Sequence, residues 1–451
     1  MVSELHWPSM SHAEFARRRR AVMERIGPQA VAIVPAAPQR LRNHDVHYPY
    51  RQDGDFRYLT GFPEPEAVAV LAPGRAGGEY ILFCRDRDPE REIWDGRRAG
   101  QEGAQREYGA DQALSIGRLD EVMPRLLDGR ERVYHTLGQQ SWLDQKLIGW
   151  LKSLRGQSRR GVHAPPEVIS LDPVLHEMRL FKSESEIALM QQAASVSAAA
   201  HRRAMRTARP GVYEYQIAAE IHHEYERNGL TWAYGTIVGS GANACILHYV
   251  ENSAVLKDGE LLLIDAGGEW QGYCADITRS FPVNGRYSGP QKALYEVVLA
   301  AQLAAIEKCR VGQHWNAPHE AAVRVLTEGL VALGLLQGEV QALVEKEAYK
   351  RFYMHSTGHW LGMDVHDVGA YKIGGEWRRF EPGMVLTVEP GLYVTPAEDV
   401  DESYWNIGIR IEDDVLITAG EPRILTHEAP KQIADVEALM RSGPLPLDGG
   451  G

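Results

Sequence analysis

The chain of 451 residues lacks the features that mark membrane and secreted proteins. No run of apolar residues approaches the ~20 that a membrane-spanning helix needs, so we expect no membrane partner. The first residues, MVSELHWPSMSHAEFARRRR, lack the apolar core of a secretory signal, which favours a cytoplasmic protein. Its length and a hydrophobic fraction of 44% predict a globular protein of two or three domains.

Cysteine is scarce, and its spacing is uninformative for metal binding. The four cysteines are far apart and form no C-x-x-C pair: Cys84, Cys245, Cys274 and Cys309. This spacing argues against a zinc–thiolate or disulfide framework. We therefore expect buried, reduced and unreactive thiols, as in a cytoplasmic protein.

An excess of basic residues is also missing. The 49 Lys and Arg residues against 61 Asp and Glu residues give a net charge of −12, which argues against a nucleic-acid partner. The one basic cluster is Arg17–Arg20, within a segment whose apolar residues Phe15, Val22 and Ile26 could share a helix face. We expect the arginines to form a solvated helix face, with a phosphate or targeting patch as the alternative.

Residues 1–175 alternate between strand-like and helix-like segments, which predicts an α/β domain with a sheet flanked by helices. The GRAGG segment between two apolar runs predicts a hairpin. We expect strands at 30–37, 67–73 and 79–85, and helices at 120–129 and 141–154. A polar segment rich in Pro and Gly, 156–173, leads to the domain boundary.

Residues 176–440 predict an α+β domain. A capping box formed by Ser183 and Glu186 opens one of its helices. We expect helices at 186–205, 213–229, 291–309 and 318–334, and strands at 236–241, 260–268, 275–283, 384–394 and 407–418. Residues 441–451, which are mostly Gly and Pro, are expected to be a disordered tail.

Two aspartates stand where a hairpin would bring them together. Asp265 ends an apolar strand and Asp276 begins the next, with the Gly-flanked segment GGEWQG between them. A turn centred on Trp270 and Gln271 would make the aspartates cross-strand partners, ~5 Å apart. Two carboxylates this close need a proton or a cation between them. The alternative is a turn cap and an unrelated surface charge.

Two glutamates also occupy strand-like segments. Glu389 closes the apolar run MVLTV just before a Pro-Gly pair, so it faces either solvent or a site. In IGIRIEDD, alternation places Arg410 and Glu412 on the face opposite the isoleucines. Taken alone, that face could simply be solvated.

Histidines cluster in the segment HSTGHWLGMDVHD, which holds His355, His359 and His366, and His248 lies upstream. The H-E-x-x-H zinc motif is absent, and Gly358 and the other glycines disfavour a helix, so a loop is expected. Single histidines are often structural, but this clustering beside strand-borne acids favours a site. Four carboxylates with one imidazole can hold two divalent ions, and such oxygen-rich ligation favours Mn²⁺.

These motifs, in this order, resemble the metallopeptidase family with the pita-bread fold, and most closely aminopeptidase P, the Xaa-Pro aminopeptidases. The N-terminal segments 42–67 and IWDGRR resemble that family's N-terminal module. The resemblance implies a pita-bread catalytic domain with two divalent ions, Mn²⁺ first, then Zn²⁺ or Co²⁺. The implied metal ligands are Asp265, Asp276, His359, Glu389 and Glu412, of which Asp276 and Glu412 bridge both ions.

The resemblance also implies roles around the metals. Glu389 would shuttle a proton to the leaving amine, while His366 would bind the substrate carbonyl and His248 the tetrahedral intermediate. Arg410 would orient substrate or a neighbouring acid. His355 and Tyr393 would form an apolar wall for the proline ring, because a bond before proline offers no N–H. Trp94, Asp45 and Asn43 could reach a pocket, in part across a subunit interface, or serve only in packing and capping.

The predicted activity is removal of the residue before proline from the N-terminus of peptides. The nearest alternative is a prolidase-like Xaa-Pro dipeptidase with the same metals and fold. A protein-binding module without catalysis is the alternative of another class, although such a module would be expected to have lost ligands. The resemblance alone implies a homo-oligomer, either a dimer or a tetramer.

Overall fold

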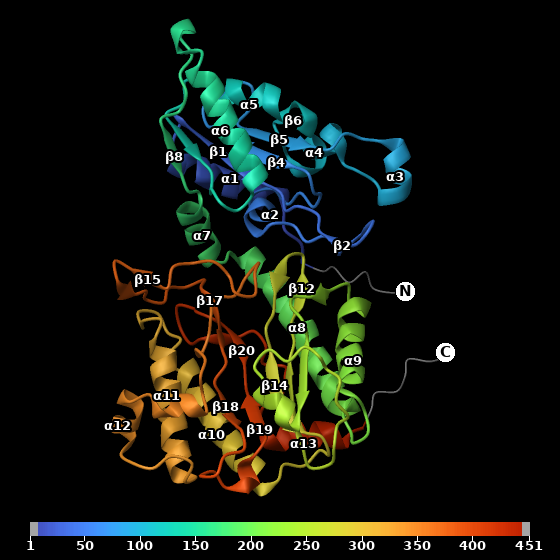
Figure 1. Cartoon of the computed structure of the whole chain (residues 1–451), viewed down its shortest axis with the longest axis vertical. Helices are drawn as coiled ribbons and strands as arrows, with labels where there is room; N and C mark the ends of the chain where they lie inside the picture. Colours follow the sequence, from blue (N-terminus) through green and yellow to red (C-terminus); the bar gives the residue numbers. More distant parts are fainter. Residues whose placement is uncertain (1–7, 444–451) are drawn as a thin grey trace. The chain divides into compact units, whose positions relative to one another are not determined.

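The computed structural model describes residues 8–443, which divide into two compact units (Figure 1). One unit spans Met10–Arg179, and the other holds the described residues from Leu180 onward. The boundary expected after residue 175 falls within α7 (Asp172–Leu180), the helix at whose end the units divide. Of the expected tail, Arg441 ends α13 (Ile433–Arg441), and residues 444–451 lie outside the described residues.

The N-terminal unit is built on a six-stranded sheet with the order β6-β5-β4-β1-β7-β8. Its strands are β1 (Ala30–Pro35), β4 (Val68–Leu71), β5 (Tyr80–Cys84), β6 (Gln112–Ser115), β7 (Arg132–Tyr134) and β8 (Glu167–Ile169). The predicted hairpin is β4–β5, which pairs antiparallel, whereas β6, β7 and β8 each join in parallel. Helices α5 (Leu119–Leu127) and α6 (Ser141–Arg155) bury their apolar residues in the core cluster of this sheet.

The arginine cluster of α1 (His12–Ile26) is not a solvated face throughout, so that expectation was wrong for two of its members. Arg18 is 1% exposed, stacks 4.0 Å from the centroid of the Tyr58 ring and donates to the Tyr58 carbonyl. Arg19 stacks similarly over Tyr80 and donates to the Leu59 carbonyl. A planar guanidinium can be buried in this way because it stacks on rings and directs its donors to carbonyls.

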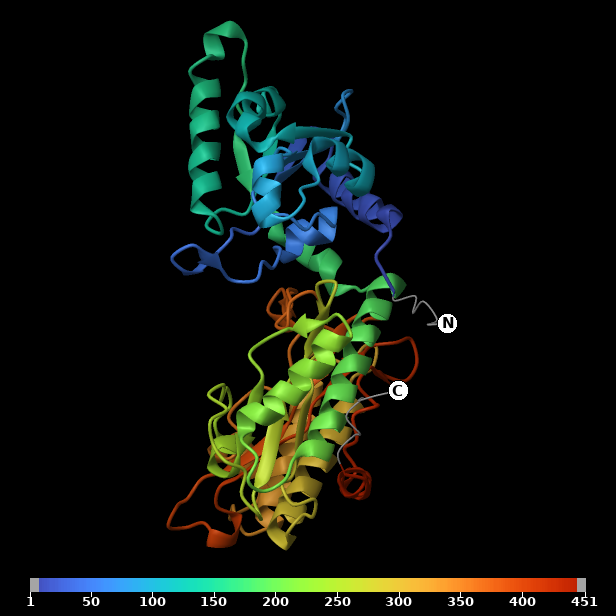
Figure 2. The same cartoon turned by 90° about the vertical axis from the view of Figure 1, so that its right-hand side faces the viewer.

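The C-terminal unit places short antiparallel strands between two pairs of helices (Figures 1 and 2). One pair is α8 (Glu184–Thr207) with α9 (Glu214–Arg227), and the other is α10 (Gly289–Ile306) with α11 (Ala317–Ala332). The strands within or beside which the predicted acidic ligands lie, together with their partner β10 (Ile237–Ser240), are β11 (Leu261–Asp265), β14 (Thr278–Pro282), β17 (Val385–Val388), β18 (Gly391–Val394), β19 (Ile407–Arg410) and β20 (Asp413–Leu416). They form the sheets β10-β11-β14 and β17-β20-β21, the latter ending in β21 (Arg423–Ile424), and the pair β18-β19.

Local sequence explains where the long helices begin. The capping box at Ser183 is formed, with Glu186 N donating to Ser183 Oγ and Ser183 N donating to the Glu186 carboxylate. Ser288 and Gln291 form the same box at the start of α10. Each box satisfies backbone donors that the first turn of a helix leaves free.

Two further sequence-based expectations concern the cysteines and the absence of a membrane-spanning helix. All four cysteines are free, and burial raises the pKa of Cys84 to about 12 and of Cys245 to about 11, as expected for unreactive thiols. Within residues 8–443, no helix combines the length and the apolar character that crossing a membrane requires.

Replacing Arg18 with lysine tests the buried arginine contacts. We expect R18K to lower the free energy of unfolding by ~2 kcal/mol, because lysine cannot both stack on Tyr58 and reach its carbonyl. Arg20 is exposed on the same helix, so R20K should leave stability unchanged. Urea unfolding of both variants provides the measurement, and equal stabilities would contradict the assigned role of Arg18.

Candidate metal centre

The two aspartates lie together on one face, although not in the predicted register. In the β11–β14 pair Asp265 is opposite Thr278, and Asp276 lies just before that strand. The hairpin turns at Gln271 and Gly272, whose φ angles of 50° and 87° suit a two-residue turn, rather than one residue earlier as predicted. The prediction of direct cross-strand partners was therefore wrong. Thr278, the residue opposite Asp265, lies two positions after Asp276. Because alternate residues of a strand share a face, Asp276 still lies on the face of Thr278.

Tyr234 connects these aspartates and was not predicted. Its hydroxyl lies 2.6 Å from Asp265 Oδ1 and 2.5 Å from Asp276 Oδ1. Burial, together with the charges of the two aspartates, raises the pKa of Tyr234 well above its usual range, so the phenol keeps its proton as a donor. It lies far from both aspartates in the sequence, and no local pattern marks it.

Glu389 and Glu412 both stand at interruptions in otherwise continuous strands. Glu389 separates β17 from β18, and Glu412 separates β19 from β20. β17 pairs with β20 and β18 pairs with β19 in one unbroken register, so the two glutamates lie opposite each other. Directly opposed residues have Cβ atoms ~5 Å apart, which brings the two carboxylates to the same place.

His359 reaches these acids from a loop, as the sequence predicted. Its ring Nε2 lies 3.5 Å from Asp276 Oδ2 and 3.6 Å from Glu389 Oε1. Ring Nδ1 lies 3.0 Å from the Trp360 carbonyl, and a carbonyl can only accept, so Nδ1 carries the hydrogen. Nε2 therefore faces the carboxylates, where it holds a proton that a metal ion can replace, and the fixed Nδ1 hydrogen is the usual second-shell arrangement of a histidine that ligates a metal.

The loop is held against β17 at Gly358. A Cβ atom at this position would lie 2.0 Å from the Thr387 carbonyl oxygen, so only glycine permits the approach. On the other side of this contact, Thr387 N donates to the His359 carbonyl and His359 N donates to Thr387 Oγ1. The position of the His359 ring thus depends on a side chain being absent one residue earlier.

Burial and crowding set the protonation of the acids. Burial raises the pKa of Asp265, against the opposing charge of Arg410, and it raises the pKa of Glu389 to about 7. Burial, followed by the charge of Asp276, raises the pKa of Glu412 well above its usual range. Burial opposes the charged form of His359 as well, but contact with Asp276 raises its pKa to about 9.

A divalent metal fits this donor set. Ligand atoms of Asp276, His359 and Glu412 all lie within 4.8 Å of one another, and Nε2 of His359 faces Asp276. Four carboxylates repel one another in a buried space, and cations relieve that repulsion. Hard oxygen donors with one imidazole are typical ligands of divalent first-row ions.

A second layer of side chains fixes the first. Arg410 donates to Asp265 Oδ2 at 2.5 Å, to Thr278 Oγ1 at 3.0 Å and to the Tyr393 hydroxyl at 2.8 Å. Thr278 in turn donates to Glu412 at 2.6 Å. Arg410 is therefore buried against Asp265 and its neighbours. The strand face that Arg410 and Glu412 share is covered, so the alternative of a solvated face was wrong. Strand alternation from Asp276 could have indicated Thr278, but its contact with Glu412 depends on tertiary packing.

Asp414 is a further partner that the sequence did not indicate. Its Oδ2 atom accepts from the backbone N–H of Asp276 at 3.1 Å, and its own backbone N–H donates to Thr426 Oγ1 at 3.1 Å. Burial raises the pKa of Asp414 well above its usual range. The side chain holds the backbone of one predicted ligand.

The remaining predicted histidines lie around this cluster. His355 Nε2 is 2.8 Å from the Tyr393 hydroxyl, and burial lowers the pKa of His355 to about 3, so its imidazole is neutral. The His366 ring lies 4.2 Å from the His359 ring, and His366 is exposed. His248 is exposed.

Three predicted residues belong to the N-terminal unit. Trp94 is 86% exposed in α3 (Pro89–Asp95). Asn43 and Asp45 are exposed in the small hairpin of β2 (Leu41–Asn43) and β3 (Val46–His47). Their contribution to a substrate pocket stays a prediction.

Comparison with known proteins assigns the class that this fold and this donor set define. The profile of metallopeptidase family M24 matches residues 188–419, and that of the aminopeptidase P N-terminal domain matches residues 15–134. The chain belongs to metallopeptidase family M24 and has the pita-bread catalytic domain expected from the motifs. As a member of this family it is an enzyme that depends on divalent metal ions.

The most informative relatives are full-length ones. The chain is 46% identical to the Xaa-Pro aminopeptidase of Escherichia coli over 96% of this chain and 98% of the relative. It is 33% identical to human Xaa-Pro aminopeptidase 3, over 96% of this chain and 86% of that protein. Among solved structures, aminopeptidase PepP of Pseudomonas aeruginosa superposes with a TM-score of 0.95 at 55% identity, covering 96% of this chain and 99% of that one.

Substitution of Gly358 by alanine tests the close approach that positions His359. We expect G358A to weaken Mn²⁺ binding at least about tenfold, because the new methyl group would displace the loop from the Thr387 carbonyl. Isothermal titration with Mn²⁺ measures the affinity. Gly289 has no heavy atom within 4 Å of a built Cβ, so G289A is the matched control and should bind as wild type. Wild-type affinity in G358A would refute the packing argument.

Proposed function

We propose that this chain is a metal-dependent aminopeptidase that removes the first residue from peptides with proline in second position. The carrying observation is the complete set of four carboxylates and one imidazole in a chain similar over its whole length to Xaa-Pro aminopeptidases.

Two divalent ions, with Mn²⁺ as the first choice and Zn²⁺ or Co²⁺ as alternatives, would be held by five side chains. These are Asp265, Asp276, His359, Glu389 and Glu412. When bound, such ions polarise the scissile carbonyl and lower the pKa of a water that they share. By the family resemblance, Asp276 and Glu412 would help to hold both ions; Asp276 lies 3.5 Å from His359 Nε2, and Glu412 lies opposite Glu389.

The proton steps are assigned to side chains of this chain. Glu389 is proposed to accept the proton of the attacking water and to deliver it to the leaving amine. Its backbone N–H is fixed by the Thr357 carbonyl at 2.8 Å, and Thr387 Oγ1 donates to its carboxylate at 3.3 Å, so the group is held for repeated transfer. His366 and His248 are proposed to donate to the carbonyl oxygen and to the tetrahedral intermediate, respectively.

Recognition of proline is assigned to the wall formed by His355 and Tyr393. The neutral His355 ring and the Tyr393 ring lie 5.6 Å apart, and Tyr393 is anchored by Arg410. An apolar wall suits a ring that offers no N–H at the scissile bond. Trp94 and Asp45, which both belong to the N-terminal unit, are proposed to reach the substrate of a neighbouring subunit in a dimer or tetramer.

A cytoplasmic location is part of the proposal. It rests on the four free cysteines and on the likeness to a bacterial aminopeptidase.

The two alternative functions are less well supported. A prolidase-like dipeptidase would share the metal ligands, but the N-terminal domain and the full-length relatives favour the aminopeptidase. A silent binding module would not need the complete donor set.

Digestion of paired peptides separates these functions. With added Mn²⁺, we expect release of glycine from Gly-Pro-Ala-Ala to be at least about tenfold faster than hydrolysis of Gly-Pro, as read by mass spectrometry. Gly-Ala-Ala-Ala should resist cleavage. The isosteric variant E389Q should bind peptide but lose at least about a hundredfold in kcat, because it has no carboxylate to carry the proton. Preference for Gly-Pro would identify a dipeptidase, and no cleavage by Mn²⁺-loaded protein would support a binding module.

A further inference from the structure

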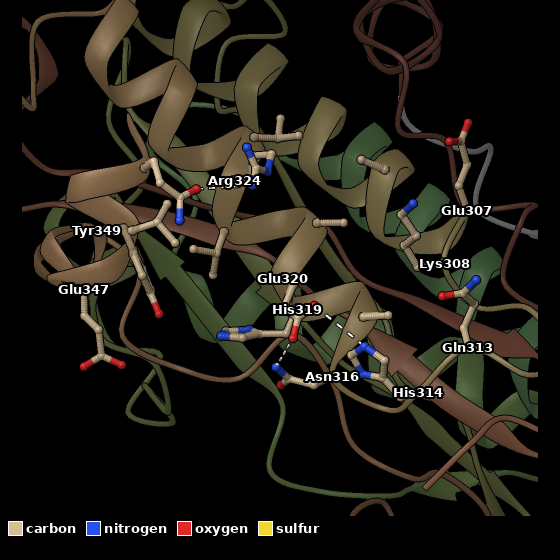
Figure 3. Close-up of a pocket in the computed structure, with 17 residues that line it drawn as sticks. Glu307, Lys308, Gln313, His314, Asn316, His319, Glu320, Arg324, Glu347 and Tyr349 are labelled. Carbon is tan, nitrogen blue, oxygen red and sulfur yellow. Dashed lines mark hydrogen bonds and ion pairs between the residues drawn. The ribbon is translucent and has the colours of Figure 1, made fainter. Parts of the chain in front are cut away.

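A cavity of about 930 Å³ opens beside α11, away from the predicted ligands (Figure 3). Its lining comes from the end of α10, from α11, and from α12 (Val340–Glu345) and the segment after it. His314 and His319 both line this cavity. They differ in what they contact. His314 lies 3.8 Å from Glu320, whereas His319 is hydrogen-bonded to Thr357, in the loop that carries His359.

The bond from His319 continues into a buried chain. His319 Nδ1 lies 2.8 Å from Thr357 Oγ1, and the Tyr353 hydroxyl lies 2.6 Å from the same oxygen. Burial lowers the pKa of His319, so its imidazole is neutral and can accept at Nδ1. If Tyr353 donates to Thr357 and Thr357 donates to His319, both hydroxyl hydrogens have a partner. The opposite order would leave the hydroxyl hydrogen of buried Tyr353 without an acceptor among residues 8–443.

Thr357 stands where this chain meets the catalytic residues. Its backbone carbonyl accepts from Glu389 N at 2.8 Å, and it precedes Gly358 and His359. Tyr353 packs its ring edge against His355 at 4.8 Å between centroids. A change in the orientation of Thr357 would therefore move Glu389, the proposed proton carrier.

We propose that His319 is a positioning residue that fixes Thr357, and through it Glu389, from the floor of this cavity. The inference rests on the proposed role of Glu389. It assigns no contact between His319 and substrate. Because the cavity reaches His319, a small molecule can occupy the space that a truncated side chain leaves.

Truncation with chemical rescue tests the proposal. We expect H319A to lower kcat for Gly-Pro-Ala-Ala about tenfold while KM and Mn²⁺ content stay at wild-type values. Added imidazole should restore kcat at least about threefold, because it can enter the cavity and accept from Thr357. H319N, whose side-chain oxygen can take the place of Nδ1, should keep most of the activity. H314A alters the same cavity without touching Thr357 and should be unaffected.

A double-mutant cycle and a readout independent of turnover complete the test. T357V removes the hydroxyl, so it should lose as much kcat as H319A, and the double variant should lose no more than either. In metal-free H319A, the peptide covering residues 385–394 should exchange amide hydrogen faster than in wild type, because the bond from Glu389 N to Thr357 is weakened.

Several results would overturn the proposal. These are wild-type kcat in H319A, equal losses in H314A and H319A, additive losses in the double variant, or unchanged hydrogen exchange. All rates are taken relative to wild type on the same peptide. An inactive wild type would instead refute the proposed function, while the hydrogen exchange of H319A would still decide whether His319 positions Glu389.

Discussion

Mutual repulsion among four buried carboxylates is the constraint on which the rest of this structure depends. Asp265, Asp276, Glu389 and Glu412 are brought into one buried space in which burial raises the pKa of three of them. Arg410 donates to one of these acids, and the remaining negative charge can be balanced by protons or by metal ions. When metal ions rather than protons balance this charge, the site can activate a water for peptide hydrolysis.

The fold brings these acids together through register rather than through a single motif. Two neighbouring strands are interrupted at the same level, so Glu389 and Glu412 face each other. A hairpin supplies the two aspartates, and a loop tightened at Gly358 supplies the imidazole. Around them, hydrogen bonds from Tyr234 and Arg410 leave the acids little freedom. Each support is a contact between elements that are distant in the sequence.

The sequence predicted the architecture well, because it leaves local signals, and the structure brings the candidate ligands that the sequence indicated close together. Strand alternation, capping boxes and the order of the motifs are properties of short segments, and the family profiles confirm the family they indicated. The exact register of the aspartate hairpin was predicted wrongly. The turn at Gln271 and Gly272 requires a positive φ angle at Gln271, which glutamine rarely adopts, so no local pattern indicated it. Burial of Arg18 and Arg19 was missed because the aromatic rings that receive them come from other elements.

The central claim is that five side chains of one domain share a pair of divalent ions. A crystal structure of the Mn²⁺-loaded protein, with anomalous data collected at the manganese edge, measures this directly. We expect two anomalous-difference peaks ~3.5–4 Å apart, enclosed by Asp265, Asp276, His359, Glu389 and Glu412. A single peak, or ions bound away from Glu412 and Asp276, would contradict it.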